Sequence, residues 1–262
     1  MKTFPSMDLD AQDWFVKVPA ITLAFWVVKI LSTTVGETVA DYLAIDAGFG
    51  QIATRTLMAA LLAMALTIQL RRPRYTPWAY WLTVVLVSIV GTQITDLLTD
   101  GFGVSLYVST PIFAVLLAAI FVAWYRVERT LSIHDIVTRR REIFYWAAIL
   151  CTFSLGTAAG DLATEALSMG FVWGVVIFGG LIAVTYAGFR MGANAVLTFW
   201  IAYVLTRPLG ASLGDLLTQA PADGGFGMGT SWTSALFLTV IVLLVALEQY
   251  EVTGRRSIQA QR

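Results

Sequence analysis

The sequence predicts an all-α membrane protein with eight transmembrane helices, arranged as four tandem helical hairpins. Composition is the first observation: the 262 residues are 58% hydrophobic and 13% charged, with a mean hydropathy of +0.75, whereas soluble domains carry about a quarter charged residues. The second is a motif that occurs four times: Trp after an aromatic residue, Gly ten residues later, and Asp five residues after that. Its members are Trp26, Gly36 and Asp41; Trp81, Gly91 and Asp96; Trp146, Gly156 and Asp161; and Trp200, Gly210 and Asp215.

The expected spans follow from apolar stretches, because about 20 apolar residues are needed to cross a bilayer. They lie at 18–44, 52–70, 77–98, 109–125, 143–165, 171–189, 193–216 and 230–249, and the odd-numbered spans carry the motif. The repeat units are therefore 18–70, 77–125, 143–189 and 193–249. The remaining segments are the N-terminal segment 1–17, the basic loop 126–142 and the C-terminal tail 250–262.

Two spans per unit make all four units face the same way. Parallel repeats are related by an axis along the membrane normal, so we expect pseudo-symmetry about such an axis, with motif spans inside and plain spans outside. Lys and Arg gather in the loops on one side of the predicted membrane. Cytoplasmic loops carry this excess, so both termini, including segments 1–17 and 250–262, are expected in the cytoplasm.

Each motif residue has an expected role. The tryptophans are expected to anchor the helices at the membrane interface, and the glycines to let helices approach closely, with a helix break as the alternative. Asp lies fifteen residues after Trp, about 22 Å deeper at 1.5 Å per residue. A carboxylate at that depth should face the protein interior or a hydrated cavity. The alternative is a local structural contact with Ser, Thr or backbone groups of the neighbouring repeat.

Differences between the copies add further candidates. Lys29, Thr33, Glu37 and Asp41 step by four along one helix face of the first copy, with Thr34 beside them. The fourth copy alone has Arg207 and Pro208, and the proline predicts a kink or break. Intramembrane charges suggest function. We expect Glu37 to pair with Arg207, or Lys29 with an acid of another copy; a purely structural buried ion pair is the alternative.

Carboxylates that share one cavity titrate as a coupled set, so they could exchange a cation for protons. Oxygen ligands suit magnesium, manganese or calcium. The expected ion- or substrate-binding residues are Glu37, Asp41, Asp96, Asp161, Asp215, Lys29, Thr33, Thr34 and Arg207, and the five acids among them are the expected metal ligands. The single Cys151 and single His134 give no disulfide framework and no further metal site.

The four motif sets, together with the segment KILSTTVGETVAD from Lys29 to Asp41, resemble a family of bacterial integral membrane proteins. Its members consist of four tandem two-helix repeats with a recurring tryptophan, catalogued as a repeat of unknown function. The resemblance covers the chain from about Val18 to Glu248. It implies a multi-pass protein of the bacterial inner (plasma) membrane and implies no activity.

These observations predict a secondary transporter or channel for a small cation, such as manganese or magnesium, with proton coupling as an option. The first alternative is a transporter of an anionic or amphipathic solute held by Lys29 and Arg207. The second is a membrane scaffold or sensor without transport. Because the chain has no P-loop, dinucleotide fingerprint or HExxH motif and no evident nucleophile arrangement, no enzyme activity and no cofactor are expected. The expected partners are the lipid bilayer, the cation and protons, with a homo-oligomer left open and no nucleic acid.

Overall fold

The computed structural model of the protein describes residues 16–42 and 50–260, without the side chains of residues 37, 40, 41, 165 and 255–260. This part of the chain forms α-helices and short 3-10 and π turns, and contains no strand. The helices are α2 (Leu23–Asp41), α3 (Gln51–Arg71), α4 (Pro77–Asp96), α5 (Leu106–Glu128), α6 (Arg139–Asp161), α7 (Phe171–Arg190), α8 (Ala195–Thr218) and α9 (Thr230–Ala260). The predicted all-α class is confirmed.

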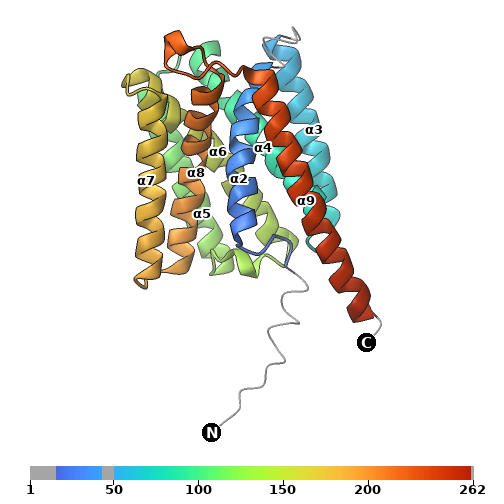
Figure 1. The fold of residues 1–262 in the computed structure, drawn as a ribbon. Coiled ribbons are helices and arrows are strands. Elements are labelled where there is room, and N and C mark those ends of the chain that lie inside the picture. The colour runs from blue at the N-terminus through green and yellow to red at the C-terminus, as the bar shows by residue number, and fades with distance from the viewer. Residues whose placement is uncertain (1–15, 43–49, 261–262) are drawn as a thin grey trace.

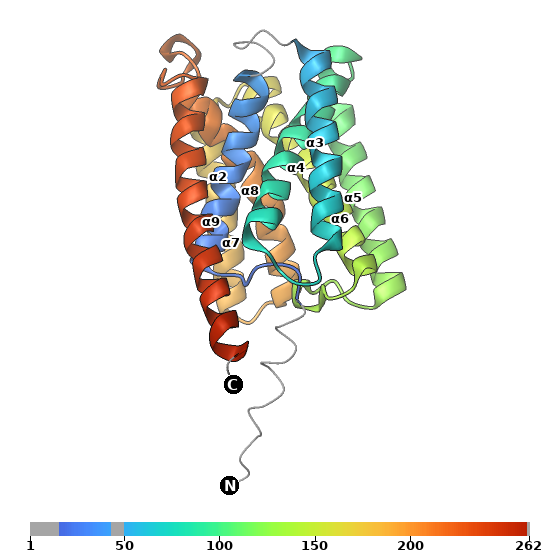
Figure 2. The ribbon, with the colours of Figure 1, turned by 90° about the vertical axis from the view of Figure 1, so that its right-hand side faces the viewer.

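Seven of the helices in the described residues are long and apolar enough to cross a membrane. The exception is α2, whose apolar part is the shorter stretch Leu23–Gly36. The chain is therefore a membrane protein with transmembrane helices. Figures 1 and 2 show the helices running roughly side by side, with the start of α2 and the end of α9 at the same end of the bundle.

The four helices that carry the motif (α2, α4, α6 and α8, the inner helices) form a closed ring. Each packs on the next, and α8 packs on α2. The motif glycines lie at these contacts, where an added Cβ would collide with the neighbouring helix. Each glycine faces the residue three positions before the glycine of the next copy: Gly36 faces Ser88, Gly91 faces Phe153, Gly156 faces Arg207, and Gly210 faces Thr33. The expected role of the glycines in close helix approach is confirmed.

The other four helices (α3, α5, α7 and α9, the outer helices) pack mainly on the inner helix of the following repeat. Thus α3 lies on α4, α5 on α6, α7 on α8, and α9 returns to α2 (Figures 1 and 2). In their most apolar stretches, 11–22% of the residues of the outer helices are buried, against 56–67% for α4, α6 and α8. The inner and outer arrangement is as predicted. The predicted helical hairpins are not packed units, however. The two helices of one repeat follow each other in the chain but make few contacts with each other.

Three of the four motif tryptophans are buried inside the protein, which differs from the predicted role as interface anchors, and Trp26 is half-buried. Trp81, Trp146 and Trp200 are at most 5% exposed. The Trp81 indole donates to Glu248 Oε2 on α9 at 3.0 Å, and the Trp200 indole donates to the Leu131 carbonyl at 3.0 Å. Because acceptors from α9 and from the loop between α5 and α6 satisfy two of these indole N–H groups, the rings are held inside the protein and support the start of the inner helices.

The expected break at Pro208 is also absent. The described α8 runs without interruption from Ala195 to Thr218 through this proline. Proline removes one backbone donor and disfavours a helix interior. We attribute the continuity to close packing on both sides, because α6 approaches through Gly156 and α2 is met through Gly210.

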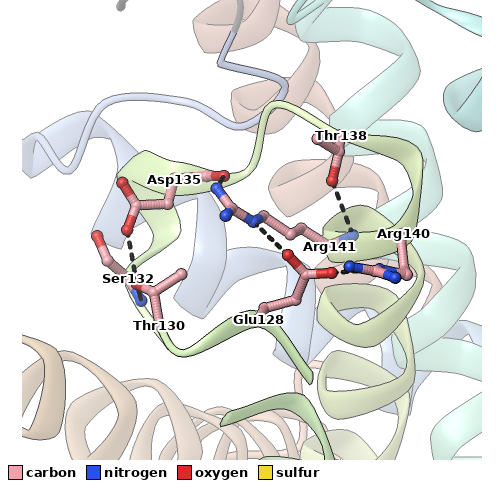
Figure 3. Close-up of polar contacts among 7 residues, drawn as sticks. All are labelled: Glu128, Thr130, Ser132, Asp135, Thr138, Arg140 and Arg141. Atoms are coloured by element: carbon pink, nitrogen blue, oxygen red, sulfur yellow. Dashed lines mark hydrogen bonds and ion pairs between the residues drawn. The ribbon is translucent and has the colours of Figure 1, made fainter. Parts of the chain in front are cut away.

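The loop between α5 and α6 is held by a polar network (Figure 3). Glu128, at the end of α5, pairs with Arg140 and with Arg141, whose Nε lies 2.8 Å from Glu128 Oε2. Arg141 also donates to the carbonyl of Asp135 at 2.9 Å, and the Thr130 hydroxyl donates to the Asp135 carboxylate at 2.6 Å. These contacts order the segment predicted as a basic loop.

This loop closes one end of the bundle, together with the segment that precedes α2. Ile133 and Ile136 are buried in the core, and the Lys17 amide donates to the Ile136 carbonyl at 2.9 Å. Arginines lie at the helix termini of this end, which we call the basic end: Arg71, Arg129, Arg139 and Arg190. The opposite end carries the motif aspartates, and we call it the acidic end.

A buried ion pair joins three segments at the basic end. The Lys17 ammonium lies 2.7 Å from Glu142 Oε2, and the two side chains are 7% and 0% exposed. Gln69 of α3 donates to the other carboxylate oxygen at 3.0 Å. Glu142 also lies in the first turns of α6, where the helix dipole favours negative charge.

The close helix contacts make a direct prediction for Gly91. An added Cβ would lie 2.6 Å from Phe153 Cβ and 3.3 Å from the Ser154 backbone nitrogen, so Gly91→Ala should cost about 1–3 kcal/mol of stability. The matched control is Gly180→Ala on α7, where nothing lies within 4 Å; it should stabilise by up to about 1 kcal/mol. Thermal melting of the detergent-purified variants measures both. Equal melting temperatures for Gly91→Ala and Gly180→Ala would contradict the close contact between α4 and α6 at Gly91.

Candidate functional site

The most unusual side chain of the bundle is Lys29, in the middle of α2. It is 1% exposed. Its ammonium lies 3.9 Å from the ring centroid of Phe153 and 4.4 Å from that of Tyr203. Among the described residues the amine has no hydrogen-bond partner and no ion pair. Ring faces attract a desolvated cation by about 2 kcal/mol or more, which offsets only part of the cost of burying it.

Lys29 belongs to a layer of side chains that all come from the same motif position, three residues after the tryptophan. The other members are Val84, Ile149 and Tyr203, and all four are at most 1% exposed. Three of the four repeats thus place an uncharged side chain at this level. The first repeat places an amine there, although a methionine of similar length would fill the same space.

Arg207 occupies the next layer, seven residues after the motif tryptophan. The equivalent residues are Thr33, Ser88 and Phe153, and none of the four is exposed. The guanidinium donates to the Thr33 carbonyl at 3.1 Å, to the Thr157 hydroxyl at 2.7 Å and to the Thr92 hydroxyl. These bonds fix it at the centre of the inner ring.

Lys29 and Arg207 lie close enough for their positive charges to repel each other. Both also face the ring of Phe153, with the guanidinium carbon 5.9 Å and the ammonium 3.9 Å from its centroid. Such repulsion is strong where water is excluded. Two cationic side chains from the first and fourth repeats thus meet at the ring of Phe153 in the third repeat.

Thr33 and Thr34, which were predicted as binding residues, contact backbone carbonyls in this structure. The Thr33 hydroxyl contacts the carbonyls of Ile30 at 2.5 Å and Thr206 at 3.3 Å, and the Thr34 hydroxyl donates to the Gly210 carbonyl at 3.0 Å. The Thr34 hydroxyl thus joins α2 to α8, and the Thr33 hydroxyl makes its shortest contact within α2 and a longer one with α8. Neither residue has a donor left for a solute in this arrangement.

The aspartates lie at the acidic end, and three of their side chains are described. Asp96, Asp161 and Asp215 are half-buried. The chain changes from α- to π-helix directly after two of them, at Leu97–Gly101 and Leu162–Ala166. Among the residues that the structure describes, no three His, Cys, Asp or Glu side chains form a group that could hold a metal ion. Asp96, Asp161 and Asp215 thus do not form such a group by themselves, and the predicted metal site stays a prediction.

Two of the predicted site residues cannot be placed. The side chains of Glu37 and Asp41 lie outside the described residues. The predicted pairing of Glu37 with Arg207 and the position of the fourth carboxylate therefore stay predictions.

The repeats of the chain match one family model. The model of DUF347, described as a repeat of unknown function, matches residues 24–75, 79–130, 144–190 and 198–250, which together are more than half of the chain. The chain belongs to this family. The predicted resemblance to a repeat family is confirmed. Each DUF347 range covers most of one inner helix and of the outer helix that follows it.

Membership of DUF347 brings no activity with it, because the family is described only as a repeat of unknown function. The comparisons with curated proteins and with solved structures found no match to this chain. The function of this DUF347 protein must therefore be argued from its own residues.

Sequence reasoning missed a set of buried tyrosines in the DUF347 repeats. Tyr80 and Tyr145 are the residues directly before the motif tryptophans of α4 and α6, and Tyr203 lies in the layer of Lys29. All three are at most 1% exposed, and the hydroxyls of Tyr80 and Tyr145 lie 2.5 Å apart. A signal was present: the aromatic residue before Trp carries a hydroxyl in two repeats and none in the others.

Proposed function

We propose that the protein is a membrane carrier for a small anionic solute, which binds between Lys29 and Arg207 on the axis of the bundle. One observation carries this proposal. The Lys29 amine is buried and has no counter-charge among the described residues. Intramembrane charges are costly and mark pathways of substrates or ions.

An anionic group supplies what this site needs. Lysine binds a carboxylate or phosphate as a point charge, and the Lys29 amine has no hydrogen-bond partner among the described residues. Arg207 would contribute mainly its charge, because its guanidinium already donates to Thr33, Thr92 and Thr157. The aromatic rings of Phe153 and Tyr203, which already face the amine, would border the apolar part of the solute. The solute class is therefore a small carboxylate or phosphate ester with a compact apolar group.

The closure of the basic end supports a carrier in place of an open channel. Ile133 and Ile136 cover that end, and the aromatic residues before the motif tryptophans lie buried beneath them: Phe25, Tyr80, Tyr145 and Phe199. A carrier keeps one side of its site closed while the other side opens, and this closure is compatible with a resting state of that kind.

We further propose that all eight helices cross the bacterial inner membrane, with the basic end in the cytoplasm and a pseudo-fourfold axis along the membrane normal. The arginines at the basic end support this orientation, because cytoplasmic loops are enriched in Lys and Arg. The glycine contacts, which recur from each inner helix to the next and return to α2, support the axis.

Cation transport at the acidic end is the second candidate. The observation in its favour is the change to π-helix directly after Asp96 and Asp161, because single π turns occur frequently at functional sites. A hard cation such as manganese or magnesium would need these carboxylates and that of Asp41 to converge. Proton coupling would follow from their mutual repulsion.

One screen separates these candidates. The purified full chain is melted with small carboxylates, phosphate and sulfate, and separately with manganese and magnesium. A ligand at 100 times its Kd stabilises by about 2.7 kcal/mol, so an anion should raise the melting temperature of the wild type. Asp161→Asn should keep this shift, because Asp161 lies at the other end of the bundle.

The other outcomes decide against the anion carrier. A shift with manganese that disappears in Asp161→Asn, without any shift by anions, would favour the cation candidate. The absence of a shift with every ligand would favour a membrane scaffold, whose buried polar groups serve only to hold the helices together.

A further inference from the structure

Two exposed arginines and an exposed indole meet at the basic end, on the outside of the bundle. Arg71 is the last residue of α3, Arg72 follows it, and Trp78 lies in the first turn of α4. The Arg72 guanidinium carbon lies 5.3 Å from the centroid of the Trp78 ring. Both arginines are exposed, and neither takes part in an ion pair among the described residues. We call these three side chains the arginine–tryptophan surface.

This surface lies at the level expected for lipid headgroups. The helices α3 and α4 are each long and apolar enough to cross a membrane, and only residues 72–76 connect them. A short connection between two membrane spans lies in the headgroup region. Trp78 is 42% exposed, whereas the motif residue Trp81 is 2% exposed. An exposed indole suits the membrane–water interface, because its ring is apolar and its N–H group is polar.

The second repeat alone has an indole at this position. Three residues before the motif tryptophan, the other repeats have Leu23, Ile143 and Leu197, and all three side chains are exposed. Aliphatic side chains there can contact acyl chains, whereas an indole can also contact polar groups. The second repeat therefore differs from the others where its surface meets the headgroups.

The charge of Arg71 and Arg72 is less balanced than that of other arginines at the basic end. Arg140 and Arg141 both pair with Glu128. By contrast, the sequence has no Asp or Glu in residues 47–95, which include α3, α4 up to its last residue and the loop between them. Glu248 on α9 reaches this loop, where its two oxygens already accept hydrogen bonds from uncharged side chains.

We propose that Arg71, Arg72 and Trp78 bind the phosphate group of an anionic phospholipid from the surrounding membrane. Arginine suits phosphate because its planar guanidinium offers a fork of N–H donors. A ring on the face of a guanidinium leaves the donors at its edge available, so Arg72 can contact Trp78 and a phosphate together. Basic clusters beside membrane spans are typical of sites for anionic headgroups. The inference is independent of the proposed function, because Lys29 lies inside the bundle.

The apolar surface next to these residues favours a lipid over a free phosphate ion. Leu82 follows Trp78 by four residues on α4, so the two share one side of the helix. Met64 precedes Arg71 by seven residues on α3 and shares its side in the same way. Both Leu82 and Met64 are exposed. Acyl chains can therefore lie along α3 and α4 while the phosphate contacts the arginines.

The test compares two lipids that differ only in their headgroups. The full chain, purified in a neutral detergent, is titrated with phosphatidylglycerol or phosphatidylcholine of identical acyl chains, and native mass spectrometry measures each Kd. Wild type should bind phosphatidylglycerol more tightly. Arg72→Gln should weaken this binding by about 5-fold, and Arg71→Gln combined with Arg72→Gln by about 30-fold, which corresponds to about 1 kcal/mol per arginine. Binding of phosphatidylcholine should not change.

The matched control is Arg140→Gln. It removes one charge from the same end of the bundle, but from an arginine that Glu128 already balances, so it should keep the affinity for phosphatidylglycerol. A loss equal to that of Arg72→Gln would show that affinity follows net charge alone, and it would overturn the site. Equal affinities of wild type for the two lipids would overturn it as well. If the double variant does not fold, Arg72→Gln alone decides.

Two further measurements locate the lipid and identify its source. Phosphatidylglycerol with brominated acyl chains should quench the fluorescence of wild type, and Trp78→Phe should remove part of this quenching. Undiminished quenching in Trp78→Phe would place the lipid elsewhere and contradict the proposal. Inorganic phosphate at the concentration of the lipid should not displace phosphatidylglycerol. Displacement would mean that the surface binds free phosphate, which would overturn the assignment to a lipid.

Discussion

Replacing Lys29 by methionine should raise the melting temperature and abolish anion-induced stabilisation. The amine is 1% exposed and has no partner among the described residues, so the fold carries the cost of its desolvation. Methionine keeps the length of the side chain and removes that cost. Replacing a buried ion pair by well-packed apolar groups is often neutral or stabilising by about 1–4 kcal/mol, and we expect a gain of the same order for this single charge. For a chain of this size, each kcal/mol corresponds to roughly 2–4 °C.

The matched control is the same substitution at the other buried lysine. Lys17 has a carboxylate partner at 2.7 Å, so Lys17→Met should lower the melting temperature while keeping the anion shift. A higher melting temperature for Lys29→Met and a lower one for Lys17→Met would indicate that Lys29 serves ligand binding and that Lys17 stabilises the fold. A lower melting temperature for Lys29→Met would mean that the amine has a structural counter-charge, and it would contradict the proposed site.

Replacing Glu142 by glutamine should destabilise the protein by about 3–5 kcal/mol, because it leaves the Lys17 ammonium buried without its partner. The carboxylate is fully buried and also accepts from Gln69, so the loss affects the segment before α2, the end of α3 and the start of α6 together. Thermal or denaturant unfolding in detergent measures the effect.

A double substitution supplies the control for this prediction. Lys17→Met combined with Glu142→Leu removes both charges and should recover most of the lost stability, because apolar replacement of a buried pair is often neutral or better. If the double variant is less stable than Glu142→Gln, packing of the two side chains and not the ion pair stabilises this end.

Much of the fold was predictable from local pattern. Composition and the fourfold motif predicted the all-α class, and the helix bounds lie near the predicted spans. The role of the glycines was also predictable, because a residue without a side chain inside an apolar helix most often serves close approach. The orientation of the tryptophans was not. An indole suits an interface or an interior with an acceptor, and the acceptors Glu248 and Leu131 lie 167 and 69 residues away in the chain.

The candidate site was predictable only in part. The spacing of four placed Lys29 and Thr33 on one face of α2, and both are buried. The spacing could not show that Thr33 is occupied by carbonyls of α2 and α8, or that Lys29 faces Phe153 and Tyr203. Those neighbours come from the third and fourth repeats, and only the closure of the inner ring brings them to the first. Because the neighbours of Lys29 could not be read from the sequence, the prediction of a cation site relied mainly on the four repeated aspartates.

The packing of each outer helix on the following repeat also determines how the molecule can be divided. A chain cut within the loop between α5 and α6 gives two fragments of four helices each. The first fragment keeps α5 without its partner α6 and α2 without its partner α9, and the second has the complementary deficit. Each fragment thus presents an unpaired outer helix and an unpaired inner helix. When the first and second fragments associate, α5 can pack on α6 and α9 can pack on α2. This reciprocal exchange of helices resembles the one in a domain-swapped dimer.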